Sequence, residues 1–124
     1  MKEIKSAEAP APVGPYSQAV MSGNLIFVSG QIALDESGNL LDASIEGQTR
    51  LIFRNITAIL KEAGSGLNKI VKISVFLVNM DYFEAANKVF EEALEQPYPA
   101  RETVEVSRLP KDADIEISVI AEIR

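Results

Sequence analysis

The chain lacks the two residue types that most often carry out catalysis, because it contains no histidine and no cysteine. This composition excludes a thiolate nucleophile, a disulfide framework, an iron–sulfur cluster and a cysteine-bound zinc. The usual general base and the commonest ligand of transition metals are missing as well. Chemistry must therefore come from carboxylates, arginine, lysine, tyrosine, hydroxyl groups, the backbone or water.

Three side chains have the types that this restricted chemistry needs. Arg101 carries a planar guanidinium that can bind a carboxylate through two parallel hydrogen bonds, and Pro97 and Pro99 stiffen the chain before it. Glu116 can position or activate a water molecule if its carboxylate is partly buried. Tyr16 can place a ring against a small substrate and a hydroxyl at its polar end.

Each of these side chains also has a purely structural interpretation. Arg101 could form a surface ion pair, and Tyr16 could simply pack. Glu116 could be a solvated strand carboxylate or an ion-pair partner of Arg108 or Lys111. The residue types alone leave these alternatives open.

Weaker signals come from two further pairs of residues. Ser29 and Gly30 end a predicted strand, where glycine either lets the backbone approach a ligand or serves a β-bulge. Phe83 and Asn87 lie four apart on one predicted helix face, and the alternative places Phe83 in the core and Asn87 in solvent. The charges of residues 111–114 are interpreted as a solvated turn.

The overall composition is that of an ordinary globular domain, and we expect residues 1–124 to form one domain. Eighteen acidic residues against twelve basic ones give a net charge of -6, the wrong sign for bulk attraction to nucleic acid or anionic lipid. The N-terminal sequence lacks the apolar segment of a signal peptide, and no apolar run approaches the roughly 20 residues of a membrane span. We therefore expect a cytoplasmic protein that does not bind membranes.

Hydrophobic periodicity predicts the elements that must position these side chains. An extended, proline-containing arm comes first, because proline fixes φ and restricts the residue before it. The predicted elements after it are strands 16–21 and 24–29 around a turn at Gly23, a helix 45–63 capped by Gly64, a strand 69–78, a helix 82–94, and strands 101–108 and 115–123. This order suits an α+β sandwich in which two helices cover one face of a sheet.

The other face of the predicted sheet is expected to be partly polar and partly apolar. Its polar members would be Arg101, Thr103 and Glu116. Its apolar members would be Ile70, Phe76, Val78 and Ile120. Such a face is either solvated or a contact with another subunit, and the apolar members favour the contact.

Four phrases in the chain carry a more specific signal. They are Val13-Gly14-Pro15-Tyr16-Ser17-Gln18-Ala19, Ser29-Gly30-Gln31-Ile32, Pro99-Ala100-Arg101, and Val104-Glu105-Val106-Ser107-Arg108-Leu109-Pro110-Lys111-Asp112 followed by Ile115-Glu116-Ile117. In content and spacing they resemble the reactive intermediate deaminase family, RidA/YjgF, along essentially the whole chain. The resemblance implies a chorismate-mutase-like (ferredoxin-like) fold and a homotrimer with its sites in the clefts between subunits.

The resemblance also implies an activity and no cofactor. Members of the family hydrolyse imines or enamines, such as 2-aminoacrylate and 2-iminopropanoate, to 2-keto acids and ammonia. These reactive intermediates come from dehydratases that depend on pyridoxal phosphate, so the activity limits metabolite damage.

Carried over by position, the family's site falls on residues of this chain. Arg101 matches the substrate-binding arginine, Glu116 the site carboxylate and Tyr16 the site tyrosine. Residues matching the substrate-binding surface are Ser29, Gly30, Phe83, Asn87 and Thr103.

Three positions depart from many members of the family. Thr103 stands where cysteine is common, Glu102 where a small residue is usual, and Ser118 where a second glutamate often follows. Strand alternation should point Glu102 away from Arg101.

Two functions are compatible with these residues, and a third is disfavoured. In a hydrolase, Arg101 would hold the carboxylate of a 2-imino acid while Glu116 positions water at its electrophilic carbon. In a binding module, the same cleft would hold a small carboxylate or 2-keto acid without turnover. Endoribonuclease activity or inhibition of translation, attributed to relatives, has little basis in a chain with net charge -6, three tyrosines and no tryptophan.

Overall fold

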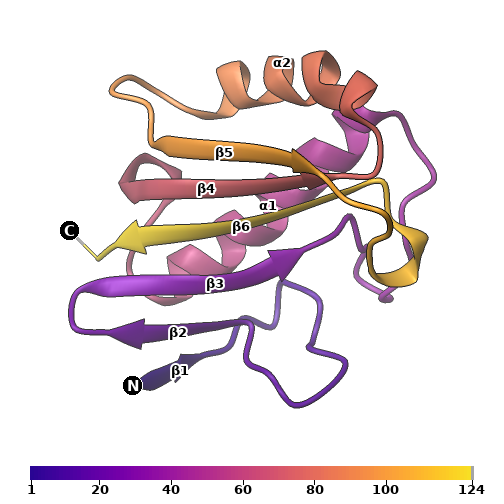
Figure 1. Cartoon of the computed structure of the whole chain (residues 1–124). Coiled ribbons are helices and arrows are strands. Elements are labelled where there is room, and N and C mark those ends of the chain that lie inside the picture. Colours follow the sequence, from indigo (N-terminus) through magenta and orange to yellow (C-terminus); the bar gives the residue numbers. More distant parts are fainter. Residues whose placement is uncertain (124) are drawn as a thin grey trace.

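The computed structural model describes residues 1–123, in which six strands form one sheet and two α-helices pack against it (Figure 1). The strands are β1 (Lys2–Ile4), β2 (Ala19–Ser22), β3 (Leu25–Gln31), β4 (Ile70–Leu77), β5 (Ala100–Glu105) and β6 (Ile115–Glu122). The helices are α1 (Ile45–Glu62) and α2 (Phe83–Ala93), with short 3-10 turns at Leu67–Lys69, Met80–Tyr82 and Pro110–Asp112. The spatial order is β1-β2-β3-β6-β4-β5, and only the β4–β5 pair is parallel. The predicted α+β fold is confirmed.

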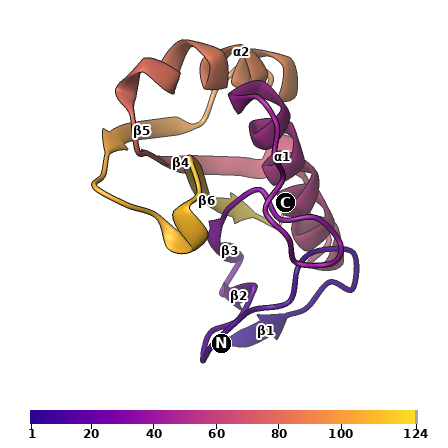
Figure 2. The same ribbon diagram turned by 90° about the vertical axis from the view of Figure 1, so that its right-hand side faces the viewer.

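Helix α1 forms because its sequence supplies both a cap and a continuous apolar stripe. The Ser44 hydroxyl accepts a hydrogen bond from the Gly47 backbone N–H, which satisfies one free donor of the first turn. The stripe of Ile52, Ile56 and Ile59 is fully buried against the sheet. Figure 2 shows α1 lying along one face of the sheet.

The central strands bury every second residue under the helices. In β6, alternate side chains starting at Ile115 are buried and those between them are half-buried, and β4 alternates in the same way from Ile73. The Phe53 ring of α1 meets the Phe90 ring of α2 edge to face, with centroids 5.4 Å apart, so both helices share this core. We call the other side of the sheet the open face.

Several details of the predicted elements were wrong. Strand β1 was missed, because three residues carry too little periodicity to reveal a strand. Residues 16–18 precede β2 instead of belonging to it, and β5 ends at Glu105. Ile70 was predicted on the face away from the helices. In β4 a register shift between Ile70 and Lys72 instead turns Ile70 into the core and leaves Val71 39% exposed.

The predicted face of β5 was also wrong. Arg101 pairs with Ile73 and Thr103 with Val75, and both partners are buried under the helices. Arg101 and Thr103 therefore lie on the helix side, whereas Glu102 lies on the open face. The sequence could not show this, because β5 is an edge strand whose residues are all exposed or half-buried.

Within residues 1–123, no helix is long and apolar enough to cross a membrane. The cytoplasmic location stays a prediction.

Candidate functional site

Arg101 is held by an aromatic platform and one hydrogen bond. Its guanidinium carbon lies 5.0 Å from the centroid of the Phe90 ring and 5.5 Å from that of Phe83. Its Nη1 donates to Oδ1 of Asn87 at 2.8 Å. Among residues 1–123 no carboxylate pairs with Arg101, so the predicted alternative of a surface ion pair is not realised within the chain. Stacking on the rings fixes the plane of the guanidinium and leaves most of its donors available for a ligand.

The predicted pair of Phe83 and Asn87 therefore meets Arg101 from one face of α2. Phe83 is half-buried beneath the guanidinium, and Asn87 also receives Arg101's hydrogen bond. Asn87 in turn donates from Nδ2 to Glu91 Oε1 at 3.5 Å. Thr103 lies two residues further along β5 on the same side and is half-buried.

Glu116 lies on the open face, half-buried and opposite Phe76 of β4. Burial raises the pKa of the Glu116 carboxyl above its usual range, because desolvation disfavours the charged form. The proposed ion-pair partners are engaged elsewhere: Arg108 pairs with Asp112 at 2.6 Å, and Lys111 Nζ donates to a backbone carbonyl. The structural interpretation of Glu116 as their partner is therefore wrong.

Gly30 is placed against the Glu116 carboxyl by an irregularity in β3. The β3–β6 register shifts between Val28 and Gln31. A Cβ atom at Gly30 would lie 2.7 Å from Cδ of Glu116, closer than such atoms can approach. The bulge that the sequence offered as one alternative is present, and the backbone of Gly30 approaches Glu116, whereas its approach to a ligand stays a prediction.

Ser29 makes two hydrogen bonds within the chain, and its role in substrate binding stays a prediction. Its hydroxyl donates to the Ser17 carbonyl at 2.6 Å, and its backbone N–H donates to the Gln18 carbonyl at 2.9 Å. These bonds tie the segment after Tyr16 to β3. Gly30, and not Ser29, lines the adjoining cavity.

Tyr16 lies in the wall of that cavity, which has a volume of about 300 Å³. Its side chain is 52% exposed, and its hydroxyl accepts a 3.4 Å hydrogen bond from the Val13 N–H. The other lining residues are Pro10, Ala11, Pro12, Val13, Gln18, Gly30, Gln31, Ile32, Leu34, Pro110, Lys111 and Glu116. The proline-containing arm thus forms one side of a cleft whose other side holds Glu116.

Two residues of this cleft were missed by the sequence interpretation. The Gln18 amide donates to the carbonyls of Ser6, Ala9 and Pro10, which pins the arm in place. Lys111 lines the cleft, and its φ of 56° is followed by 58° at Asp112, a left-handed conformation that is rare for residues with a side chain. The sequence did offer a signal for Gln18, because this glutamine follows a proline-rich arm. It holds no signal for the left-handed backbone at Lys111.

The predicted site residues thus form two groups on opposite sides of the sheet. Phe83, Asn87, Arg101 and Thr103 gather on the helix side, at the β5 edge. Tyr16, Gly30 and Glu116 gather around the cleft on the open face. One chain does not bring the two groups together.

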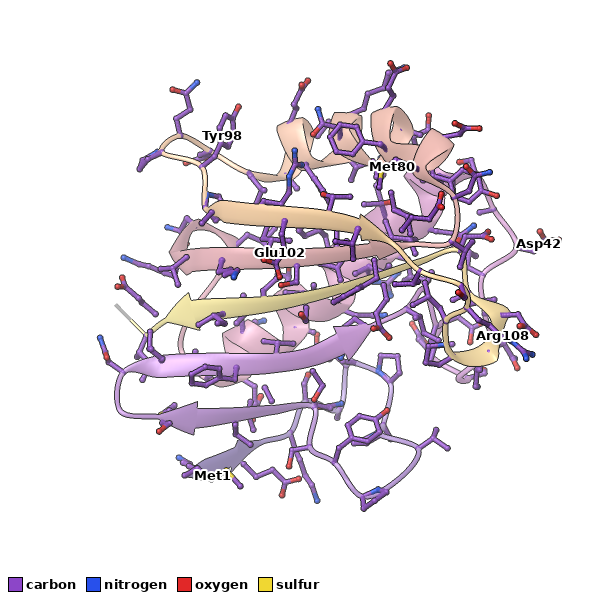
Figure 3. All side chains as sticks on the ribbon, viewed as in Figure 1. Met1, Asp42, Met80, Tyr98, Glu102 and Arg108 are labelled. Atoms are coloured by element: carbon purple, nitrogen blue, oxygen red, sulfur yellow. The ribbon has the colours of Figure 1, made fainter. Side chains whose placement is uncertain are left out.

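Glu102 does not interfere with Arg101. Its carboxylate pairs with Lys72 at 3.3 Å and accepts a hydrogen bond from the Ser74 hydroxyl at 3.2 Å. Figure 3 shows Glu102 on the open face, away from α1. The predicted alternation of β5 is confirmed at this position.

The arrangement of groups contains no evident metal centre. Residues 1–123 include no cluster of three or more acidic side chains placed to ligate a metal ion. The two groups instead offer a cation for an anionic ligand and a carboxylate whose proton affinity is raised.

Comparison with known proteins places this geometry in a family. The family model described as Endoribonuclease L-PSP matches residues 6–123. The chain belongs to the RidA/YjgF family. A RutC family protein of Pyrococcus horikoshii is 48% identical over 123 residues, which cover 98% of both chains.

Solved structures of the RidA/YjgF family have the same fold. RidA from an Antarctic Psychrobacter species superposes with a TM-score of 0.94 at 41% identity, covering 98% of this chain and 99% of the other. TdcF of E. coli, solved with bound serine, has a TM-score of 0.90 at 38% identity, covering 98% of both chains. The family resemblance predicted from the four phrases is confirmed.

Proposed function

We propose that this protein is a homotrimeric hydrolase that deaminates reactive 2-imino and 2-enamino acids to 2-keto acids and ammonia. The observation that carries the proposal is the division of the site: an arginine that forms no ion pair within residues 1–123 lies on one side of the sheet, and a desolvated carboxylate lies on the other. Arg101 brings the planar fork that can hold a carboxylate, and Glu116 brings a carboxyl whose pKa is raised by burial. Membership of the RidA/YjgF family supports the same activity.

Assembly is what would complete this site. The open face presents apolar side chains to solvent, including Phe27 at 40% and Val104 at 43% exposure, with Ile120 between them in the sheet order. Burying such side chains against another subunit is favourable. In the proposed trimer, Arg101 of one subunit faces the Glu116 cleft of the next.

The proposed reaction begins with orientation of the substrate. The remaining N–H groups of Arg101 hold the substrate carboxylate, and the stacking on Phe83 and Phe90 keeps the guanidinium plane fixed. An enamine is first protonated at carbon to give the imine. The carbon of the C=N bond is then electrophilic enough for attack by water.

Glu116 accepts and returns the proton that is transferred when water adds to the imine. Its carboxylate accepts a proton from water as the water oxygen bonds to the imine carbon, and it returns that proton to the nitrogen to give the carbinolamine. The carbinolamine then collapses as its hydroxyl proton passes through Glu116 to the amine nitrogen, the C–N bond breaks, and ammonia and the 2-keto acid depart. Because its pKa is raised, Glu116 can hold and return a proton closer to neutral pH than an ordinary glutamate. No cofactor enters any step of this proposal.

A second candidate is a binding module on the same site. It is favoured by one observation, the serine bound to TdcF of E. coli, which is a small carboxylate ligand in a relative. The RNA function suggested by the name of the family model has less support, because the net charge of -6 opposes binding to a polyanion.

An assay with 2-aminoacrylate distinguishes these functions. The enamine is generated in situ by a dehydratase, and its decay is followed with and without the protein. The proposal predicts that formation of the 2-keto acid accelerates in proportion to protein concentration. Ligand binding without any acceleration would identify a binding module instead.

A further inference from the structure

The surroundings of Arg101 contain more space than a carboxylate fills. A cavity of about 440 Å³ opens beside the guanidinium, and we call it the side-chain cavity. Its wall consists of Ile73, Asn87, Phe90, Glu91, Leu94, Tyr98, Pro99 and Arg101. Most of these residues are apolar, which is typical of a site that receives an apolar group.

The side-chain cavity has a rigid floor and an exposed outer wall. Ile73, Phe90 and Leu94 are at most 9% exposed and belong to the main core. Tyr98 is 55% exposed, so this part of the wall borders solvent. An apolar group that entered here would be covered by the core below and by the Tyr98 ring beside it.

Arg101 fixes where the side-chain cavity lies relative to a bound substrate. Its guanidinium stacks on Phe90, and the same ring forms part of the cavity floor. A carboxylate held by Arg101 therefore stands at the edge of this floor. In a 2-imino acid the side chain is attached one carbon from that carboxylate, within reach of the cavity.

We propose that the side-chain cavity receives the substrate's side chain and selects 2-imino acids with branched aliphatic or aromatic side chains over 2-iminopropanoate. This inference rests on the proposed function and adds its specificity. A single methyl group would leave the apolar wall largely uncovered. A larger apolar group would exclude water from it and gain the corresponding free energy.

A negative charge in the wall of the side-chain cavity restricts which substrate side chains fit. Glu91 is the one acidic residue among the described residues that line the side-chain cavity, and it accepts the hydrogen bond from Asn87. Its carboxylate repels a substrate whose side chain is also acidic. A basic side chain would have to lose its hydration over the apolar floor and could reach a carboxylate only at Glu91, so apolar substrates remain the best fit.

The test compares a series of 2-imino acids generated in situ by an amino acid oxidase from alanine, leucine, phenylalanine, glutamate and lysine. For the unmodified protein, kcat/KM for the leucine and phenylalanine imines should exceed that for the alanine imine by about tenfold or more. Tyr98→Ala should lower this ratio several-fold, and Tyr98→Phe should restore it. Glu95→Ala, an exposed neighbour in the same loop, serves as the control substitution.

Binding of the 2-keto acid products, measured by calorimetry, gives the same comparison without turnover. Tighter binding of 4-methyl-2-oxopentanoate than of pyruvate, weakened by Tyr98→Ala, would support the inference. Equal use of all imines, a preference for the lysine-derived imine, or a ratio unchanged by Tyr98→Ala would overturn it while leaving the deaminase intact. Failure of every imine to react faster would overturn the proposed function itself.

Discussion

Arg101 has well-defined surroundings in the structure. It sits on two aromatic rings, bonds to Asn87 and pairs with no carboxylate among residues 1–123. A cation that only contributes to stability would be expected to have an acidic partner. The guanidinium is instead fixed in orientation and left available, as recognition of an anionic ligand requires.

Replacing Arg101 should impair catalysis without unfolding the protein. Hydrogen bonds to a charged group contribute about 1.5 to 3 kcal/mol, so Arg101→Ala should lower kcat/KM by roughly tenfold to more than a hundredfold. Arg101→Lys keeps the charge and loses the planar fork, so it should recover only a small part of the loss. Steady-state kinetics on 2-iminopropanoate measure both effects, and circular dichroism checks the fold. Full activity of the lysine variant would disprove bidentate recognition.

The burial of Glu116 should make the free energy of unfolding of the protein depend on pH. Since its pKa is raised in the folded chain, the folded state binds this proton more tightly than the unfolded state. The resulting stabilisation is lost as the pH rises through the raised pKa. Glu116→Gln has no such loss, so its stability advantage over the unmodified protein should grow in urea denaturation as the pH rises through the raised pKa of Glu116.

The same variant tests the chemistry of Glu116. If the carboxylate accepts the proton of water, kcat/KM of the unmodified protein should fall as the pH drops through the raised pKa. Glu116→Gln should be nearly inactive at every pH and should lack this acidic limb. Glu95→Gln, at an exposed position, is the matched control. An unaltered pH profile in Glu116→Gln would return this residue to a structural role.

At the scale of elements, the bulge in β3 sets the distance between the backbone of Gly30 and the carboxylate of Glu116. The register shift between Val28 and Gln31 brings Gly30 against Glu116, where no Cβ atom fits without displacing the carboxyl. The conformation of Gly30 is not the reason for the glycine, because its φ is not among the positive values. Close approach alone requires it.

Gly30→Ala should therefore move the Glu116 carboxyl and leave the strand in place. We expect a large loss of kcat with a nearly unchanged far-ultraviolet circular dichroism spectrum. Gly23→Ala provides the contrast, since Gly23 lies in the β2–β3 turn with φ of 62° and open space around it. That substitution should cost stability and spare the rate, so equal activity losses in both variants would contradict the proposed contact.

The sequence predicted the elements with an internal period and missed what depends on pairing. Helices α1 and α2 and strands β4 and β6 were located from apolar spacing, because their buried faces repeat over eight residues or more. The face of Arg101 was wrong because register, not alternation, decides which side of an edge strand is covered. The left-handed backbone at Lys111 and Asp112 has no glycine or asparagine to announce it.

At the scale of the whole molecule, the division of the site implies an assembly. Two groups of side chains on opposite sides of one sheet cannot act on a single small substrate within one chain. A closed ring of subunits repeats the same contact and can join unlike surfaces. The trimer implied by the family resemblance would create three such contacts.

The proposed trimer makes a direct prediction about mass in solution. Light scattering or sedimentation should give about three times the chain mass of 13.5 kDa at micromolar concentration. Phe27→Glu, on the apolar open face, should weaken assembly and lower activity together. A monomer with full activity would place the whole site within one chain and contradict the divided arrangement.

Complementation between two inactive variants tests the shared site most directly. Arg101→Ala and Glu116→Gln are purified separately, mixed in equal amounts, dissociated in mild denaturant and reassembled together. If each site takes Arg101 from one subunit and Glu116 from its neighbour, random mixing restores about one quarter of the unmodified activity. Each variant reassembled alone should keep its own low activity. If the mixture also keeps this low activity while forming trimers, both residues belong to the same subunit's site and the proposal is contradicted.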